Sequence, residues 1–268
     1  MKTVLTIAGS DCSGGAGIQA DIKTIAAHKL YAMSAITALT AQNTMGVYGA
    51  ALTKPYFITK QIDCIFADIV PDAVKIGMLA NAAIIEAVAL SLKKYKAKNI
   101  VVDPVMISTS GRKLINVGAV TSLKKKLFSL AVLITPNIPE AEVLSGVKIK
   151  NKRDMFAAAR KIYEDSGASV LVKGGHLKRC ADDILYCNGK TRWFKGEKIN
   201  NPNNHGTGCT LSSAIACNLA TGRSLEQSIQ NAKNYITGAL KAGIALPAKG
   251  AGPLNHCYNL RFKTTRSL

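Results

Sequence analysis

The strongest chemical signal in the chain is a polar, glycine-rich turn at residues 203–209, with the sequence NNHGTGC, which leads directly into an apolar stretch. Its two glycines, Gly206 and Gly208, allow neighbouring backbone N–H groups to point at one spot, and the N-terminus of the following helix adds positive potential. Such a turn can hold an anion, including a phosphoryl group during its transfer. Cys209 stands at the same place, where a helix N-terminus lowers the pKa of a thiol. Taken alone, the turn equally suits an ordinary helix start with a buried cysteine.

Three further polar clusters follow predicted strands and strengthen this signal. Asn137 and Glu140, three residues apart, can hold a hydrated Mg²⁺ or its waters. Lys173 precedes two glycines and is well placed to reach a phosphate. Asp103 is an isolated carboxylate at a strand end, and the cost of burying it unpaired points to a partner cation. Each cluster has an ordinary structural explanation by itself, so their shared location at strand ends is what favours phosphoryl transfer.

These side chains can meet only if the strands that precede them lie side by side. The chain alternates short apolar runs with amphipathic stretches, which predicts βαβ units and a mostly parallel sheet. In such a sheet, ligands bind at the carboxyl ends of the strands. The predicted strands are Thr3–Ala8, Ala32–Leu39, Ala73–Ile76, Asn99–Val102, Ala131–Thr135 and Ser169–Lys173, followed by short β pieces between Asp183 and Ile199. The predicted helices are Ile18–His28, Pro55–Asp68, Ala82–Tyr95, Val117–Leu127, Arg153–Asp165, Leu211–Ala220 and Leu225–Ala242.

A second glycine-rich segment, GAGIQA at residues 15–20, follows the first predicted strand and fits the dinucleotide-binding pattern G-x-G-x-x-A. That pattern needs an acidic residue about 20 positions further on to hold the ribose hydroxyl. No Asp or Glu lies between Asp21 and Asp63, which argues against a nicotinamide cofactor. The chain also contains no G-x-x-x-x-G-K-[ST] motif, and it has no C-x-x-C or H-E-x-x-H motif of the kind that binds zinc.

Composition excludes several classes of protein. The 268 residues are 48% hydrophobic, which excludes a disordered chain, and the seven cysteines are too few and odd in number for a disulfide framework. No uncharged apolar run reaches the roughly 18 residues that a membrane-spanning helix needs. We expect no signal peptide, no membrane contact and a cytoplasmic protein with reduced cysteines.

The charge is unevenly distributed along the chain. The net charge is +19, from 35 basic and 16 acidic residues, yet residues 1–92 contain 6 of each, so the excess lies wholly in residues 93–268. A basic field attracts phosphates, whether of a nucleotide or of a nucleic acid. Nucleic-acid binding as the main function would need a reading motif or exposed aromatic residues, and only 6% of the chain is aromatic. We therefore expect no specific nucleic-acid partner.

The strand-end segments combine into one pattern that spans residues 3 to about 242. The segments are AGSD (8–11), GGAGIQAD (14–21), TALTAQNT (37–44), VKIGML (74–79), VDPVM (102–106), TPN (135–137), KGGH (173–176) and HGTGC (205–209). In these segments the chain resembles the hydroxymethylpyrimidine/phosphomethylpyrimidine kinases of thiamine biosynthesis, within the ribokinase-like superfamily. The resemblance implies an α/β fold, a ribokinase-like three-layer α/β/α sandwich with a central mostly parallel sheet. We expect residues 1–268 to form a single domain, with a basic C-terminal tail from about residue 250.

The resemblance also implies the reaction and the pyrimidine site. It implies that the enzyme uses ATP and Mg²⁺ to phosphorylate 4-amino-5-hydroxymethyl-2-methylpyrimidine and then its monophosphate. Gln42 corresponds to the side chain that reads the pyrimidine edge. The pocket around it is formed by Gly9, Asp11, Met78 and Val105.

The remaining functional positions carried over from the family concern the phosphates. Gly206, Thr207 and Gly208 correspond to the anion hole, with Cys209 as the candidate base; Lys173, Thr135 and Asn137 to the ATP site; and Asp103 and Glu140 to the metal site. Most ribokinase-like sugar kinases carry Asp at the position of Cys209, so cysteine there argues against a sugar substrate. The chain departs from the family at Cys12, where Ser is usual.

One alternative within this fold stays open and another is disfavoured. A pyridoxal or pyridoxine kinase of the same fold would accept a similar ring with a similar hydroxymethyl group. A non-catalytic, ligand-binding relative is disfavoured because the glycine turn, Asp103 and Lys173 are all intact. We expect the protein to form a homodimer.

Overall fold

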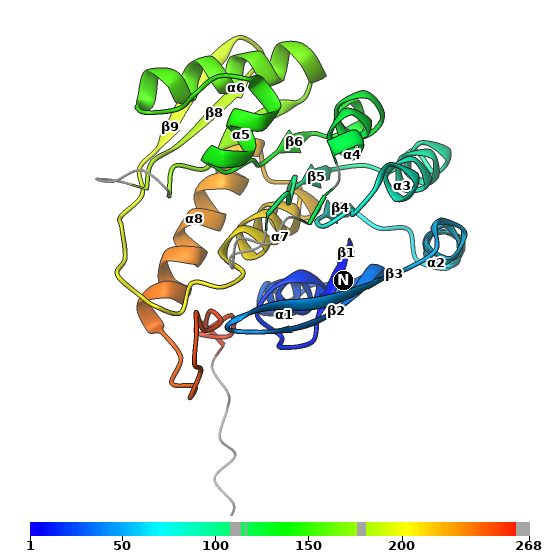
Figure 1. The fold of residues 1–268 in the computed structure, drawn as a ribbon, viewed down its shortest axis with the longest axis horizontal. Helices are drawn as coiled ribbons and strands as arrows, with labels where there is room; N and C mark the ends of the chain where they lie inside the picture. Colours follow the sequence, from blue (N-terminus) through cyan, green and yellow to red (C-terminus); the bar gives the residue numbers. More distant parts are fainter. Residues whose placement is uncertain (108–113, 116, 176–180, 261–268) are drawn as a thin grey trace, which may run out of the picture.

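The computed structural model describes residues 1–107, 114, 115, 117–175 and 181–260 of the chain. Within these residues, nine strands form one sheet in the order β3-β2-β1-β4-β5-β6-β7-β8-β9 (Figure 1). The strands are β1 (Thr3–Asp11), β2 (Tyr31–Asn43), β3 (Gly46–Leu52), β4 (Ala73–Ile76), β5 (Ile100–Val102), β6 (Leu133–Ile134), β7 (Ser169–Val172), β8 (Asp183–Cys187) and β9 (Lys190–Phe194). The predicted mostly parallel sheet is confirmed: β2, β1, β4, β5, β6 and β7 pair in parallel, and antiparallel strands close both edges.

Helices cover both faces of the sheet, which confirms the three-layer α/β/α sandwich. They are α1 (Gly17–Ala27), α2 (Pro55–Asp68), α3 (Ala82–Lys94), α4 (Val117–Ser122), α5 (Ile138–Ser145), α6 (Lys152–Ser166), α7 (Thr207–Ala220) and α8 (Leu225–Ala242). Successive strand residues point to opposite faces. Val4 and Val101 therefore pack against α1, α7 and α8, whereas Leu5 and Val102 pack against helices α2 to α6. The central strands are mostly apolar because both of their faces are buried, and Thr6 in β1 and Lys75 in β4 are buried exceptions.

Local sequence signals set most helix boundaries. Asn151 caps α6 by accepting hydrogen bonds from two backbone N–H groups, and Gly167 ends the helix with φ of 73°. Ser224 begins α8 with a capping box that includes Gln227. These devices explain why the predicted boundaries of both helices lie within a residue or two of the observed ones.

The structure departs from the predicted elements most clearly in four places. Helix α5 was not predicted, although Asn137 and Glu140 form a capping box at its start. Strand β3 was not predicted, and β2 runs four residues further than expected to pair with it, because this antiparallel pair lies largely outside the core and lacks a strong apolar pattern. The helix predicted over 117–127 ends in a π-helical turn, Leu123–Leu127, followed by a short 3₁₀ turn. Helix α7 begins at Thr207 rather than Leu211, so half of the glycine-rich turn is already helical.

A buried ion pair ties four elements together beneath the carboxyl edge of the sheet. The Nζ of Lys75, in β4, donates to both carboxylate oxygens of Asp21, in α1, at 2.9 and 2.8 Å. Thr6 in β1 and Ser213 in α7 donate to the same carboxylate at 2.6 and 2.7 Å. Because the group is sealed from solvent and hydrogen-bonded from every side, it fixes α7 against the sheet.

No helix in the described part of the chain is both long and apolar enough to span a membrane.

Candidate active site

A cavity of about 690 Å³ lies at the carboxyl edge of the sheet. Thirteen of the fourteen residues predicted to form the site line this one cavity: Gly9, Asp11, Gln42, Met78, Asp103, Val105, Asn137, Glu140, Lys173, Gly206, Thr207, Gly208 and Cys209. The fourteenth, Thr135, is fully buried and does not line it. The sheet therefore brings together side chains that are up to two hundred positions apart in the sequence.

The glycine-rich turn forms the N-terminus of α7 and faces the cavity. Gly206 precedes the helix with φ of 84°, and a Cβ atom there would lie 1.9 Å from the carbonyl oxygen of Gly15. Only glycine suits both the left-handed backbone and the close approach of the two loops. The first N–H groups of a helix have no carbonyl partner within it. In α7 the N–H of Thr207 donates to the carbonyl of Asn204 at 3.3 Å, so the next N–H groups, of Gly208 and Cys209, are the ones placed for an anion in the cavity.

Cys209 lies in the first turn of α7, but its environment opposes ionisation. Burial raises the pKa of the Cys209 thiol to about 11, although the nearby charge of Lys75 acts in the opposite direction. The prediction that the helix N-terminus lowers this pKa is therefore wrong in direction, because the loss of hydration outweighs the helix terminus. Cys209 is a protonated thiol at neutral pH.

The partner cation predicted for Asp103 is a lysine of the same cavity. The Nζ of Lys173 donates to Oδ1 of Asp103 at 2.7 Å, and the hydroxyl of Thr135 donates to the same oxygen at 3.3 Å. Burial lowers the pKa of Lys173, but the carboxylates of Asp103 and Glu140 outweigh it and raise the pKa overall. Thr135 thus lies beneath the site and orients Asp103, so it is not placed to touch a nucleotide directly.

Asn137 and Glu140 are held by each other as well as lining the cavity. The Asn137 side chain accepts from the N–H of Glu140 at 2.9 Å, and Glu140 Oε2 accepts from the N–H of Asn137 at 2.8 Å, which forms the capping box of α5. The pKa of Glu140 is raised to about 7 overall. Burial is the largest cause, the nearby charge of Lys173 acts in the opposite direction, and the charge of Asp103 also raises the pKa. The described residues contain no cluster of three or more potential metal ligands. Asp103 and Glu140 nevertheless both line the cavity, and one or two carboxylates are the usual protein contribution to an Mg²⁺ site that is completed by water and phosphate oxygens.

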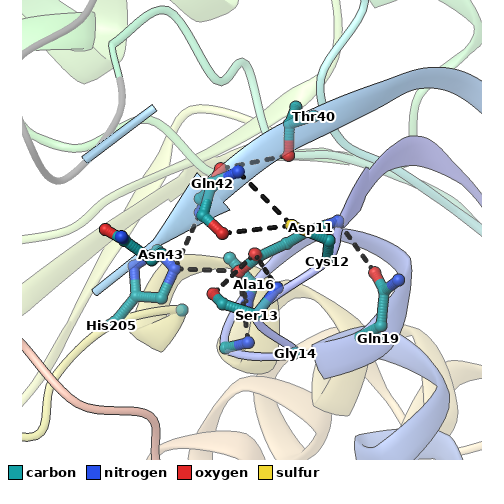
Figure 2. Close-up of polar contacts among 12 residues, drawn as sticks. Asp11, Cys12, Ser13, Gly14, Ala16, Gln19, Thr40, Gln42, Asn43 and His205 are labelled. Atoms are coloured by element: carbon teal, nitrogen blue, oxygen red, sulfur yellow. Dashed lines mark hydrogen bonds and ion pairs between the residues drawn. The ribbon is translucent and has the colours of Figure 1, made fainter. Parts of the chain in front are cut away.

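The opposite end of the cavity is organised by the carboxylate of Asp11. Its Oδ1 accepts from the backbone and hydroxyl of Ser13 at 2.9 and 2.7 Å, and its Oδ2 accepts from the N–H groups of Gly15 and Ala16 at 3.1 and 2.8 Å. Burial raises the pKa of Asp11, but hydrogen bonds from His205 and Ser13 outweigh it and lower the pKa to about 2. Asp11 therefore holds the loop between β1 and α1 in shape around Gln42 (Figure 2).

Sequence reasoning missed three charged or polar residues of this region. His205 contacts both Asp11 and Gln42, yet nothing in the local sequence links position 205 to positions 11 and 42. Lys75 lies in an otherwise apolar strand and could have been noticed as an unusual charge there. Lys233, in α8, donates to Oδ2 of Asp183 at 2.6 Å at the far end of the cavity.

The segment after residue 250 is packed against the site as far as the structure describes it. Gly252 accepts from the N–H of His205 at 3.0 Å, and the N–H of Gly250 donates to the Thr44 hydroxyl at 3.2 Å. Leu254 and His256 are buried. The predicted tail therefore begins later than residue 250. Residues 261–268, and His176 of the KGGH segment, lie outside the described residues.

Comparison with known families gives one model that matches most of the chain. The phosphomethylpyrimidine kinase family matches residues 11–255. Among curated proteins, the thiamine biosynthesis bifunctional protein of Geobacter sulfurreducens is 48% identical over 95% of this chain, which spans 52% of that longer protein. The hydroxymethylpyrimidine/phosphomethylpyrimidine kinase of Haemophilus influenzae is 41% identical, with 96% of this chain and 97% of that protein covered.

Solved structures show the same relationship. The phosphomethylpyrimidine kinase of Clostridium difficile 630 is 48% identical, with a TM-score of 0.80 and coverage of 88% of this chain and 98% of that one. The pyridoxal kinase of Staphylococcus aureus, in complex with AMP-PCP and pyridoxal, is 33% identical, with a TM-score of 0.88 and coverage of 97% and 95%. Similarity therefore extends to kinases of two different ring alcohols.

Proposed function

The chain is a kinase that belongs to the phosphomethylpyrimidine kinase family, and from this premise we propose that it makes the diphosphate of 4-amino-5-hydroxymethyl-2-methylpyrimidine for thiamine biosynthesis. It transfers a phosphoryl group from ATP first to the alcohol and then to the monophosphate. The observation that carries this proposal is the single cavity, because one space is lined both by Gln42 and by the Asp103–Lys173 pair.

The mechanism follows from the arrangement of charge around the cavity. The primary alcohol attacks the γ-phosphorus in line, the bond to the β-phosphate oxygen breaks, and ADP leaves. Transition states of this kind are loose, so positioning and charge stabilisation contribute more than a strong base. The N–H groups at the start of α7 and the ammonium of Lys173 stabilise the transferring group. Asp103 and Glu140 would hold Mg²⁺, which supplies charge neutralisation for the phosphates.

Cys209 contributes as a thiol in this mechanism. Its raised pKa leaves almost no thiolate at neutral pH, so we assign it to positioning the alcohol, and the alcohol proton passes to an oxygen of the transferred phosphoryl group. Cys209→Ser keeps a small hydroxyl at the same place and should lower kcat by less than about tenfold. The result that would support a thiolate base has two parts. Cys209→Ser would lose more than about a thousandfold in kcat, and kcat would rise at alkaline pH in the wild type but not in the variant.

The decisive experiment compares acceptors with the purified enzyme. ATP consumption is measured with the pyrimidine alcohol, its monophosphate and pyridoxal, each varied at saturating ATP. We expect kcat/KM for the pyrimidine alcohol to exceed that for pyridoxal by at least about tenfold, and the monophosphate to be consumed as well. A preference for pyridoxal, or no reaction with the monophosphate, contradicts the proposal.

Pyridoxal phosphorylation is the second candidate, and a specific observation favours it. Structures of pyridoxal kinases from Bacillus subtilis and Staphylococcus aureus match this chain with TM-scores of 0.87 and 0.88. The higher identities, however, are to pyrimidine kinases, at 48% and 41%. We therefore place pyridoxal as a secondary acceptor.

The expected setting and assembly of the enzyme are part of the proposal. None of the six cysteines among the described residues is in a disulfide, which supports a reducing compartment such as the cytoplasm. Large apolar side chains are exposed on β2, β3, the turn between them and the first turn of α2, which supports association of two copies. They are Leu39, Met45, Tyr48, Leu52, Tyr56 and Phe57. Sedimentation of the pure protein tests the dimer.

A further inference from the structure

The imidazole of His205 lies between two groups of the pyrimidine end of the cavity. Its Nε2 is 3.0 Å from Oδ2 of Asp11 and 3.0 Å from the amide nitrogen of Gln42 (Figure 2). The side chain is 10% exposed, and the ring packs on Gly15, where a Cβ atom would lie 2.3 Å from its Cδ2. The close packing fixes the position of the ring, so its contacts are decided by where its protons lie.

The proton inventory of these contacts allows one arrangement. Asp11 is ionised, since its pKa is about 2, and a carboxylate can only accept hydrogen bonds. The Nε2 of His205 must therefore carry a proton. A protonated Nε2 cannot accept a hydrogen bond from the NH₂ group of Gln42, because both groups are donors. The amide avoids this opposition of two donors when it is turned by 180°, so that its oxygen and Oδ2 of Asp11 share the one Nε2 proton of His205.

Thr40 completes the arrangement at the other end of the amide. Its hydroxyl donates to the carbonyl of Ser10 at 2.8 Å and lies 3.3 Å from the far atom of the Gln42 amide. Since that hydroxyl proton is already committed, Thr40 has lone pairs to offer. With the amide turned, one N–H of its NH₂ group donates to Thr40, and the contacts of Gln42 with His205 and Thr40 no longer oppose donor to donor.

We propose that His205 is a positioning residue for substrate recognition, which fixes the orientation of the Gln42 amide. The amide keeps one oxygen lone pair and one N–H for the ligand. That pair complements the adjacent amino group and ring nitrogen of an aminopyrimidine, in the way that Gln and Asn side chains read adenine. Pyridoxal offers no such amino group beside a ring nitrogen. The inference rests on the proposed function and assigns the discrimination between the two rings to His205.

Kinetics of two variants at this position test the role. His205→Leu removes the donor and should raise the KM for the pyrimidine alcohol about ten- to hundredfold, with the KM for ATP changed by less than about twofold. His205→Gln carries an N–H donor of similar reach and should recover the KM to within about fivefold of the wild type. The backbone N–H that bonds to Gly252 persists in both variants.

A second buried histidine provides the matched control. Nε2 of His256 lies 3.0 Å from the hydroxyl of Thr210 in α7, the helix that begins just after His205. His256 does not line the cavity. His256→Leu should lower the melting temperature without separating the two KM values. If His205→Leu raises both KM values equally, or if His256→Leu produces the same separation, the positioning role is wrong.

The proton on His205 is measured independently of activity. Long-range ¹H–¹⁵N correlation spectra of the ligand-free protein near neutral pH should show a protonated Nε2 at His205. A bare Nε2 would overturn the inference whatever the substrate is. A wild-type enzyme that ignores the pyrimidine alcohol contradicts the proposed function instead, so the two failures are distinguishable.

Discussion

Two lysines of this protein each pair with a buried aspartate, and the surroundings of the two pairs differ. Lys75 and Asp21 have fully buried side chains, at 0% exposure each, and Thr6 and Ser213 donate to the same carboxylate. The side chains of Lys173 and Asp103 are 13% and 3% exposed, and both residues line the cavity. The sealed pair can act only on the fold, whereas the open pair can exchange its partner for an incoming phosphate.

The comparison teaches that burial of a charge does not by itself indicate a functional site. Removing one member of a buried pair leaves an uncompensated charge, whose cost depends on whether water can replace the lost partner. Water or a ligand can reach Asp103 from the cavity but cannot reach Asp21. Substitutions in the sealed pair should therefore change mainly the stability of the protein, and substitutions in or beside the open pair should change mainly its activity.

The largest effect is expected from Lys75→Met, which should lower the free energy of unfolding by about 3–5 kcal/mol. The reason is that the Asp21 charge stays buried without a cation. Unfolding by denaturant measures this change in free energy. Lys75→Met combined with Asp21→Asn should recover most of the loss, because the amide oxygen can still accept from one of the hydroxyls of Thr6 and Ser213 while the amide NH₂ group donates to the other. Lys94→Met breaks an exposed pair with Asp63 and should leave stability nearly unchanged.

Lys173→Met should lower kcat by about 10²–10³-fold, since it removes a cation from the transferring phosphoryl group. Its stability should fall by less than that of Lys75→Met, because the cavity hydrates Asp103. Steady-state kinetics and unfolding are measured on the same preparation. The distinction between the pairs fails if Lys173→Met unfolds as readily as Lys75→Met while retaining its kcat.

Glu140, beside the open pair, should make stability depend on pH. Its pKa rises from 4.5 to about 7 on folding, so the folded state keeps a proton that the unfolded state releases. Its contribution to stability is therefore complete below pH 4.5 and is lost as the pH rises through about 7. Relative to Glu140→Gln, the wild type should lose on the order of 1–3 kcal/mol over this range. A constant difference between the two proteins at all pH values contradicts this assignment.

The smallest effect is expected from Gly208→Ala. The new Cβ would lie 3.4 Å from both Oδ2 of Asp103 and Nζ of Lys173, which the fold tolerates. It nevertheless occupies space above the open pair, so kcat should fall about tenfold with little change in melting temperature. Gly206→Ala should instead destabilise the protein, because its Cβ would collide with the carbonyl of Gly15. The role of Gly208 is contradicted if Gly208→Ala and Gly206→Ala change kcat and the melting temperature by the same amounts.

The sequence by itself determined most of the elements in their order and the place of the site. Apolar periodicity, capping residues such as Asn151 and Ser224, and the segment NNHGTGC act over a few residues. They therefore remain readable in the linear chain. Parallel strands bring their carboxyl ends to one edge, which is why thirteen predicted residues meet in one cavity.

The tertiary structure decided how these groups are paired and charged. The charge of Asp103 is neutralised by Lys173, which lies 70 positions further along the chain, and His205 contacts Asp11, from which it is separated by 194 positions. No local pattern encodes such pairings. The thiol of Cys209 shows the physical reason most clearly: the sequence revealed the helix terminus that lowers its pKa, but only packing set the desolvation that raises it to about 11.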